Sequence, residues 1–351
     1  MGNIDLTGGL DASLDYPLAR RPENPQMRDS VSMWISDDQG RFGLPRVCIE
    51  AVAEIWENRG IQANIGFPDG RILNGAGGYA PTHPAADQPR HEIIDAGPLA
   101  FRVIEPLRRW TMRFDGKATD TTVQRQIGND PGGPEKRVRV EIEAVMAVPP
   151  WIAGEQAVAA GDTSTASAIG AIGGHRHEQL FRCSGFLEIE GEDRMPFTGP
   201  GLRIRRTGVR NVGDFPGHCW QSALFPSGKA FGLTAFPPRS DGTSAYNEAF
   251  VWDGARKRYA KVIEAPWLNR LHLNGANADV VLETSDGERI RISGTVRESA
   301  FFDQGTPLFG DWSYDGGVGL PFHQGGVLYE WDGETTYGMI ERSLPKHRIQ
   351  P

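Results

Sequence analysis

Two histidines at alternate positions, His175 and His177, carry the clearest chemical signal in this chain. In an extended strand both side chains lie on one face together with Gln179 and Phe181, because successive side chains alternate between faces. Two imidazoles on one face can act as a paired acid and base, or can bind a metal. A cupin-like metal site would need Glu four or five residues after His177, where Phe181 and Arg182 stand instead, so we predict no metal. The alternative is that one histidine is a hydrogen-bonded wall residue and the other lies in solvent.

The same strand face changes from polar to apolar along its length. After His177 and Gln179 come Phe181, Cys183, Leu187 and Ile189 in the same register. In a β-barrel this gradient predicts a pocket with an apolar floor and polar groups near the mouth. The opposite face carries charged residues, which predict a surface ladder of ion pairs: Arg176, Glu178 and Arg182.

A second group of chemical side chains lies in the Gly-rich stretch 309–324. It contains Asp311, Trp312, Tyr314 and His323. An Asp held against aromatic rings has a raised pKa and can protonate an alkene or enol, and the rings can stabilise the resulting cation. The alternative is a surface loop whose Asp residues make turns and whose Trp packs as a lid.

Tyr337 and Glu341 lie on one face of the last predicted strand. If this face is buried, Glu341 needs a partner, since an unpaired buried carboxylate is costly. We predict an ion pair with an inward-facing arginine such as Arg203.

The elements that position these residues are predicted to be strands. The chain has 351 residues with 44 Gly and 25 Pro, which favours many short strands joined by tight turns. Acidic or serine residues followed by Gly separate apolar runs at Asp69-Gly70, Asp115-Gly116, Glu190-Gly191, Ser227-Gly228, Asp253-Gly254, Asp286-Gly287 and Asp332-Gly333. The sequence therefore predicts an all-β fold of antiparallel hairpins.

Two domains are predicted, 1–165 and 166–351. Residues 1 to about 28 are expected to lie on the surface as an arm, and a short helix over 154–160 is expected to precede a linker. A weak repeat, Phe67-Pro-Asp-Gly-Arg71 and Phe225-Pro-Ser-Gly-Lys229, suggests two copies of one unit.

Charge and hydropathy restrict the partners. The net charge of −8 and pI near 5.6 argue against a nucleic-acid groove or an anionic membrane surface. No apolar run is long enough to span a bilayer, and the first residues lack the features of a secretory signal. We expect a cytoplasmic protein whose partner is a small hydrophobic molecule; a homodimer is compatible with this. No nucleophile elbow, P-loop or dinucleotide fingerprint is present, so no cofactor is expected.

Several short motifs together resemble the tandem-lipocalin group of carotenoid hydratases, AttH-like proteins and pericyclic cyclases. They are Asp29-Ser-Val-Ser-Met-Trp34, Phe67-Pro-Asp-Gly-Arg71, Trp110-Thr-Met-Arg-Phe-Asp-Gly116, His177-Glu-Gln179 and Tyr337-Gly-Met-Ile-Glu-Arg342. The resemblance implies two tandem lipocalin-like (calycin) antiparallel β-barrels. Many relatives carry Gly-x-Arg-Asp-His-Ser-Trp where this chain has Gly201-Leu-Arg-Ile-Arg-Arg-Thr207, so chemistry that depends on that Asp-His pair is absent here.

Two functional hypotheses follow. The first is a cofactor-independent lyase or isomerase that uses proton transfer to hydrate, isomerise or cyclise a hydrophobic alkene, terpenoid, steroid or aromatic substrate. Its catalytic residues would be His177, Asp311, His175 and His323, and its ligand-binding residues Gln179, Phe181, Arg203, Trp312, Tyr314, Tyr337 and Glu341. The second is a non-catalytic carrier of the same kind of molecule.

Overall fold

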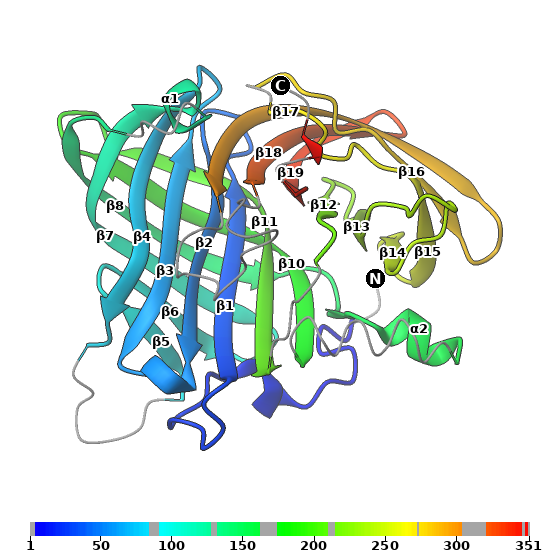
Figure 1. The fold of residues 1–351 in the computed structure, drawn as a ribbon, viewed down its shortest axis with the longest axis horizontal. Helices are drawn as coiled ribbons and strands as arrows, with labels where there is room; N and C mark the ends of the chain where they lie inside the picture. The colour runs from blue at the N-terminus through cyan, green and yellow to red at the C-terminus, as the bar shows by residue number, and fades with distance from the viewer. Residues whose placement is uncertain are drawn as a thin grey trace.

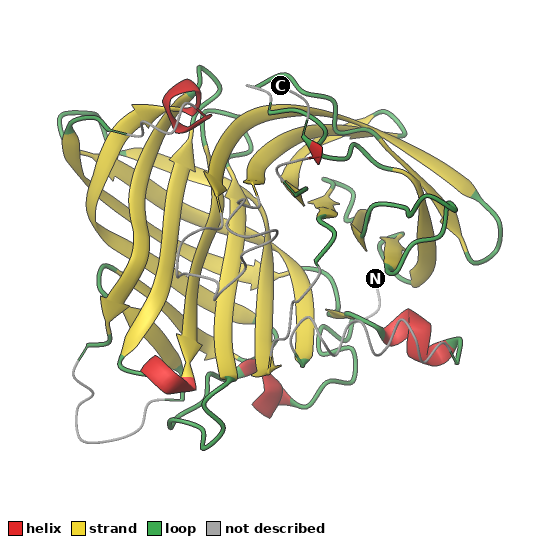
Figure 2. Cartoon of the chain, in the orientation of Figure 1, coloured by secondary structure: helices red, strands yellow, loops and turns green. Residues whose placement is uncertain are grey.

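Antiparallel strands are the main elements of the computed structural model, which describes residues 4–83, 91–127, 132–161, 174–209, 215–271, 274–303, 321–345 and 348–349 (Figures 1 and 2). The all-β prediction is confirmed, and the strands form two barrels. The only helices of the described residues are short: η1 (Ala12–Asp15), η2 (Ala53–Ile55), α1 (Val123–Ile127) and α2 (Glu155–Ala159). Helix α2 matches the helix predicted at 154–160.

The first barrel contains strands from both sides of the predicted domain boundary. Its strands are β1 (Met27–Ser36), β2 (Gly43–Val52), β3 (Asn58–Gly66), β4 (Arg71–Pro81), β7 (Arg109–Thr122), β8 (Glu135–Met146), β10 (His175–Ile189) and β11 (Met195–Val209). They pair in the order β4-β3-β2-β1-β11-β10-β8-β7, and a further pairing of β4 with β7 closes the ring. Strands β5 (Ile93–Ala96) and β6 (Leu99–Glu105) extend the sheet from β7, and β9 (Trp151–Ile152) pairs with β10.

The second barrel is a closed antiparallel meander in chain order. Its strands are β12 (His218–Leu224), β13 (Ala230–Ala235), β14 (Asn247–Trp252), β15 (Lys257–Glu264), β16 (Val280–Thr284), β17 (Arg289–Asp303), β18 (Pro321–Trp331) and β19 (Glu334–Ser343). The chain therefore passes from the first barrel to the second between Val209 and His218, whereas the predicted domain boundary lies between residues 165 and 166.

The turns predicted from acidic or serine residues followed by Gly are found in six of the seven places. Each of these six glycines has a positive φ, between 76° at Gly333 and 99° at Gly254. The prediction for Asp115-Gly116 is wrong, because both residues lie inside β7. Gly116 is needed there for a close approach, since a Cβ on it would lie 2.7 Å from a Pro98 side-chain carbon.

The sequence repeat corresponds to two identical turns, one in each barrel. Phe67 N donates to Arg71 O at 3.0 Å and Gly70 N donates to Phe67 O at 3.0 Å, between β3 and β4. The equivalent bonds between β12 and β13, made by Phe225 N and Gly228 N, measure 2.8 and 2.9 Å. The repeat thus marks equivalent hairpin turns of the two barrels.

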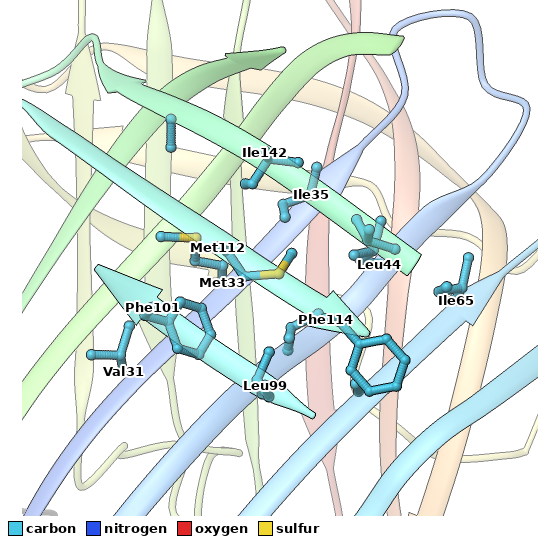
Figure 3. Close-up of a cluster of buried hydrophobic side chains, with 14 of the residues drawn as sticks. Val31, Met33, Ile35, Leu44, Ile65, Leu99, Phe101, Met112, Phe114 and Ile142 are labelled. Carbon is cyan, nitrogen blue, oxygen red and sulfur yellow. The ribbon is translucent and has the colours of Figure 1, made fainter. Parts of the chain in front are cut away.

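The first barrel is filled by apolar side chains that alternate along its strands. Figure 3 shows Met33 of β1, Phe101 of β6 and Met112 of β7 directed into one cluster. The same cluster contains Phe181, Cys183, Leu187 and Ile189 of β10, as the alternating pattern predicts. The apolar end of this strand face is therefore packed core.

The outer walls of the two barrels pack against each other. A buried apolar cluster joins them, and Trp34 of β1 meets Trp220 of β12 edge to face with ring centroids 4.6 Å apart. The expected surface ladder on β10 is wrong in this region: Glu178 is buried, forms an ion pair with Arg176 and accepts a hydrogen bond from Trp220 Nε1 at 3.0 Å. The second barrel covers this face of β10, which the strand pattern alone could not predict.

Candidate functional site

The predicted site residues lie in different parts of the molecule. His175, His177, Gln179 and Arg203 meet at one end of the first barrel, Glu341 lies between the barrels, and His323 lies inside the second barrel. Phe181 is fully buried core, and Tyr337 is half-buried, with its hydroxyl next to the position a Cβ would take on Gly40. Asp311, Trp312 and Tyr314 fall outside the described residues.

Asp15 holds the group at the end of the first barrel together. Its carboxylate accepts from Arg203 Nη1 at 2.5 Å, Leu107 N at 2.6 Å, Trp110 Nε1 at 2.8 Å and His177 Nε2 at 3.1 Å. The expectation that the whole N-terminal arm lies on the surface is therefore wrong at Asp15, which is completely buried. Arm residues fill the position that the sequence suggested as the mouth of a pocket.

The hydrogen bonds of this group fix the proton positions on both histidines. Burial would raise the pKa of Asp15, but Arg203 and His177 hold it far below its usual range, so the group is a carboxylate. Burial lowers the pKa of His177 to about 4, so its imidazole is neutral near pH 7. The Nε2–H of His177 must therefore donate to Asp15, and its Nδ1 accepts from His175 Nε2 at 3.1 Å. Gln179 accepts from Arg203 Nη2 at 2.6 Å and extends this polar network, in which Nε of Arg203 is buried without a hydrogen-bond partner among the described residues.

Hydrogen bonds also fix the proton position on His323, inside the second barrel. Arg342 Nε donates to its Nδ1 at 3.0 Å, so the ring hydrogen of the neutral form lies on Nε2 and points to Ser299 Oγ at 3.0 Å. In this tautomer His323 cannot take a proton from Ser299. The pair is therefore not arranged as a nucleophile and base.

Glu341 is at the centre of a polar group between the barrels. It accepts from Arg46 Nη1 at 3.2 Å, His218 Nε2 at 3.2 Å and Gln324 Nε2 at 2.5 Å. Gln62 of β3 in turn donates to Gln324 Oε1 at 2.8 Å. The predicted ion pairing of Glu341 is found, but the partner is Arg46 instead of Arg203.

Local backbone geometry directs the two main partners of Glu341. Arg46 has a φ of 68°, a left-handed conformation unusual for a residue other than glycine, at an irregular register between β2 and β3. In this conformation the guanidinium of Arg46 reaches across the interface to Glu341. His218 lies opposite Ser343 in the β12–β19 ladder, and its Nδ1 lies 2.7 Å from Ser343 Oγ.

A cavity between the two barrels adjoins this group. Its lining comes from both barrels: Ser30, Ser32, Arg46, Cys48, Ile49, Glu50, Arg176, Ile204, Arg206, Phe215, His218, Trp220, Thr234, Phe236, Phe322 and Glu341. The space open to the centres of water-sized molecules is about 60 Å³. This volume holds a few waters and is smaller than the pockets that enclose ring-sized ligands.

The electrostatics of this cavity suit proton transfer. Burial would raise the pKa of Glu341, but Arg46 and His218 lower it to about 2, so it is a carboxylate near pH 7. Burial lowers the pKa of His218 although Glu341 opposes this, so the imidazole is neutral and can accept a proton. The tautomer follows from the carboxylate: Nε2–H donates to Glu341, and Nδ1 is the acceptor facing Ser343 Oγ. Ser343 is not part of the cavity lining, so its hydroxyl orients the imidazole and is not positioned to attack a ligand.

Sequence reasoning missed the residues that surround Glu341. Neither Arg46 nor His218 is among the candidate residues that the sequence indicates. The nearest signal was the requirement that an inward Glu341 have a cationic partner. Nothing in the sequence indicated which of the chain's arginines would reach it.

Among the described residues no group of three or more His, Cys, Asp or Glu side chains is arranged to hold a metal ion. In the same part of the chain, no helix is both long and apolar enough to cross a bilayer. All three cysteines are buried and unpaired with one another.

A protein-family model matches nearly the whole chain. The family is described as "Domain of unknown function (DUF7064)", and the match covers residues 15–346. The chain belongs to this family. The matched region includes Asp15, both barrels and the cavity between them. No curated protein matched the chain of this DUF7064 member.

Two solved structures share the fold of this family member. One is a Nitrosomonas europaea protein whose crystal structure is described as that of an AttH; it is 15% identical, with a TM-score of 0.52, over 92% of this chain and 97% of that chain. The other is CghA, 10% identical, with a TM-score of 0.51, over 91% of this chain and 88% of that chain. At these identities the likeness concerns the fold alone. It confirms the two-barrel fold that the resemblance to the tandem-lipocalin group implies.

Proposed function

We propose that this chain is an enzyme that catalyses proton transfer on a hydrophobic, oxygen-bearing substrate in the cavity between the barrels. The substrate class is an alkene, terpenoid, steroid or aromatic compound, and the reaction is hydration, isomerisation or cyclisation without a cofactor. The observation that carries the proposal is the neutral His218 held by ionised Glu341 at the wall of a cavity that also has aromatic rings.

His218 is the acid–base group in this proposal. Substrate binding displaces Ser343 Oγ from His218 Nδ1, which then accepts a proton from the substrate, and Glu341 at Nε2 stabilises the imidazolium that forms. The imidazolium, whose proton exchanges with solvent, then gives a proton to another atom of the substrate, which completes an isomerisation or a ring closure. In a hydration His218 takes the proton from water instead, the hydroxide adds to one carbon of the substrate, and the proton is delivered to the neighbouring carbon. No proton is gained or lost overall.

The charges around the cavity favour an anionic over a cationic intermediate. Three guanidinium groups line it, those of Arg46, Arg176 and Arg206, against two carboxyl groups, those of Glu50 and Glu341. Guanidinium groups stabilise an enolate or phenolate oxygen and oppose a carbocation. The substrate therefore carries a carbonyl or phenol oxygen next to its apolar skeleton. Because the cavity is small, binding requires the lining side chains to rearrange.

The decisive experiment is incubation of the protein in heavy water with a panel of steroid, terpenoid, chalcone-like and aryl-alkene compounds, followed by mass spectrometry. Deuterium fixed at carbon, or a product heavier by one water, is expected with the wild-type protein. His218→Gln should abolish this change. His175→Gln is the matched control, because it removes an imidazole outside this cavity and should retain turnover.

The contrary results are equally specific. Turnover that survives in His218→Gln but is lost in His175→Gln or His177→Gln would move the chemistry to the end of the first barrel. A compound that co-purifies unchanged would support the carrier function. One observation favours that alternative: Glu341 is already satisfied by Arg46, His218 and Gln324, as in a purely structural ion pair.

A further inference from the structure

A second cavity lies at the end of the first barrel that the N-terminal arm crosses, drawn in dark blue in Figure 1. The arm forms one wall, and the other walls come from residues around the start of β3, just after β4 and in β5. The space open to the centres of water-sized molecules is about 330 Å³, against about 60 Å³ between the barrels. The two cavities share no lining residue, and the larger one has the size of a small-molecule pocket.

Charged side chains are prominent in the lining of this second cavity. Six of its fourteen lining residues are charged, three cationic and three acidic: Arg20, Arg21, Arg59, Asp29, Glu57 and Asp95. The carboxylate of Asp29 is already bound in an ion pair by Arg205, which does not line the cavity. Three guanidinium groups therefore face two remaining carboxyl groups, and the wall has an excess of one positive charge.

Arg59 is a half-buried cation in this wall. Its Nη1 donates to the Asp95 carbonyl at 3.0 Å, and its guanidinium lies 5.3 Å from the centre of the Trp56 ring. Its Nε is buried and has no hydrogen-bond partner among the described residues. Within the same part of the chain no carboxylate forms an ion pair with it. Burial lowers the pKa of Arg59, but an arginine stays charged near pH 7, so this cation can accept an anionic partner from the cavity.

The arm adds two guanidinium groups on the exposed side of the cavity. Arg20 and Arg21 are both exposed, and neither forms an ion pair with another described residue. The arm is fixed just before them, because Leu18 N donates to the Asp29 carboxylate at 2.6 Å. A ligand in the cavity can thus be held between Arg59 on one side and the two arginines of the arm on the other.

The chemistry of the wall suits a phosphate group attached to a hydroxyl-bearing body. Guanidinium groups bind phosphate oxygens through paired, charge-assisted hydrogen bonds, and a phosphate monoester carries about two negative charges near pH 7. Hydroxyl groups can donate to Asp95, whose carboxylate accepts no hydrogen bond within the described residues. His83 Nε2 donates to the Gly97 carbonyl at 2.8 Å, so Nδ1 of the neutral ring is a further acceptor.

We propose that this cavity binds a phosphate monoester of a small polyhydroxylated compound. The phosphate lies against Arg59 and the two arginines of the arm, and the hydroxyl groups donate to the carboxylates of the wall. The site is separate from the cavity between the barrels and does not depend on the proposed function. No bond of the ligand is made or broken there.

The test is isothermal titration calorimetry of the full-length protein with ribose 5-phosphate, with ribose and with inorganic phosphate. The wild-type protein is expected to bind ribose 5-phosphate at least tenfold more tightly than ribose, because a charge-assisted hydrogen bond is worth about tenfold or more in affinity. Inorganic phosphate should bind more weakly than the ester, since it lacks the hydroxyl-bearing body. Arg59→Gln should weaken binding of the ester at least tenfold. Arg291→Gln is the matched control, because it removes an exposed guanidinium from the second barrel, and it should leave the affinity unchanged.

A second variant keeps the proposal testable if Arg59→Gln does not fold. The double variant Arg20→Gln/Arg21→Gln changes exposed side chains alone and should also weaken binding of ribose 5-phosphate, whereas binding of ribose should not change. The proposal is overturned if ribose 5-phosphate does not bind, if it binds no more tightly than ribose or inorganic phosphate, or if the double variant binds it as tightly as Arg291→Gln does.

Discussion

Arg46 of the first barrel and Glu341 of the second form an ion pair of 3.2 Å, although 295 residues separate them in sequence. Their side chains are only 11% and 5% exposed, so the pair is shielded from water. Arg46 and Glu341 both line the cavity between the barrels, so the charge distribution in this cavity depends on how the two barrels are placed. The packing of the two barrels and the electrostatics of the cavity are therefore coupled at this ion pair.

Replacing Arg46 with Gln should destabilise the protein by about 3 kcal/mol, because it leaves the buried Glu341 without its cationic partner. The measurement is urea unfolding at pH 7. The double variant Arg46→Gln/Glu341→Gln should recover part of the loss, since no charge is then stranded. Lys117→Gln, which breaks an exposed pair with Glu135, is the control and should leave the unfolding free energy unchanged. If Arg46→Gln lowers the unfolding free energy no more than Lys117→Gln does, the ion pair of Arg46 with Glu341 does not stabilise the protein.

His177 should make the protein less stable as the pH falls. Its pKa is about 4 in the folded state and near 6.5 when unfolded, so the unfolded chain binds more protons between these values. The unfolding free energy should fall by about 3 kcal/mol from pH 7 to pH 4 through this group alone. His177→Gln should flatten the dependence, and His175→Gln should flatten it less. Urea unfolding at pH 7 and pH 4.5 tests this; an unchanged slope in His177→Gln would contradict it.

Glu298 should make the protein less stable as the pH rises, which is the opposite of the effect of His177. It is 3% exposed, it has no hydrogen-bond partner among the described residues, and a Cβ on Gly43 or Gly326 would collide with its side chain. Burial raises its pKa to about 8, so the folded protein keeps a proton that the unfolded chain loses above about pH 4.5. Stability from this group is full below pH 4.5 and is lost as the pH rises toward 8.

When the pH rises from 5 to 7.5, the unfolding free energy of Glu298→Gln should therefore fall by about 3 kcal/mol less than that of the wild-type protein. Urea unfolding at the two pH values measures this difference. Glu341→Gln provides an opposite control. The pKa of Glu341 is about 2, so the carboxylate stabilises the folded state at neutral pH and its removal should destabilise it there. The same sign of change at pH 7.5 in both variants would refute this assignment.

The proposed catalysis predicts that substitutions of His218, Glu341 and Ser343 have different effects on kcat and on its pH dependence. Once a substrate is found, His218→Gln should lower kcat by roughly 10²- to 10⁴-fold, the usual contribution of a general acid–base group. Glu341→Gln removes the carboxylate that raises the pKa of His218, so the acidic limb of the kcat–pH profile should move to lower pH. Ser343→Ala should lower kcat less than His218→Gln. A profile that does not move in Glu341→Gln would exclude His218 as the titrating base.

The strand pattern could be predicted from the sequence because alternation and turn residues act locally. The apolar half of β10 and six of seven glycine turns are examples. The site could not be predicted in the same way. Arg176 and Glu178 have the pattern of an exposed face, and only the second barrel buries them. Asp15 has the pattern of a surface arm, yet it supplies the acid for Arg203 and His177. Such contacts depend on which surfaces meet, and a single sequence does not contain that information.

The pairing of β1 with β11 has a consequence for synthesis of the chain. Met27 pairs with Val209, so the first barrel cannot close until about 180 later residues have been made. Loop closure over such a distance is slow, and an unpaired strand edge is prone to aggregate in the meantime. We therefore expect nascent chains that end near residue 165 to need chaperones. Fragments that end after β11 should be the shortest in which the first barrel becomes resistant to protease.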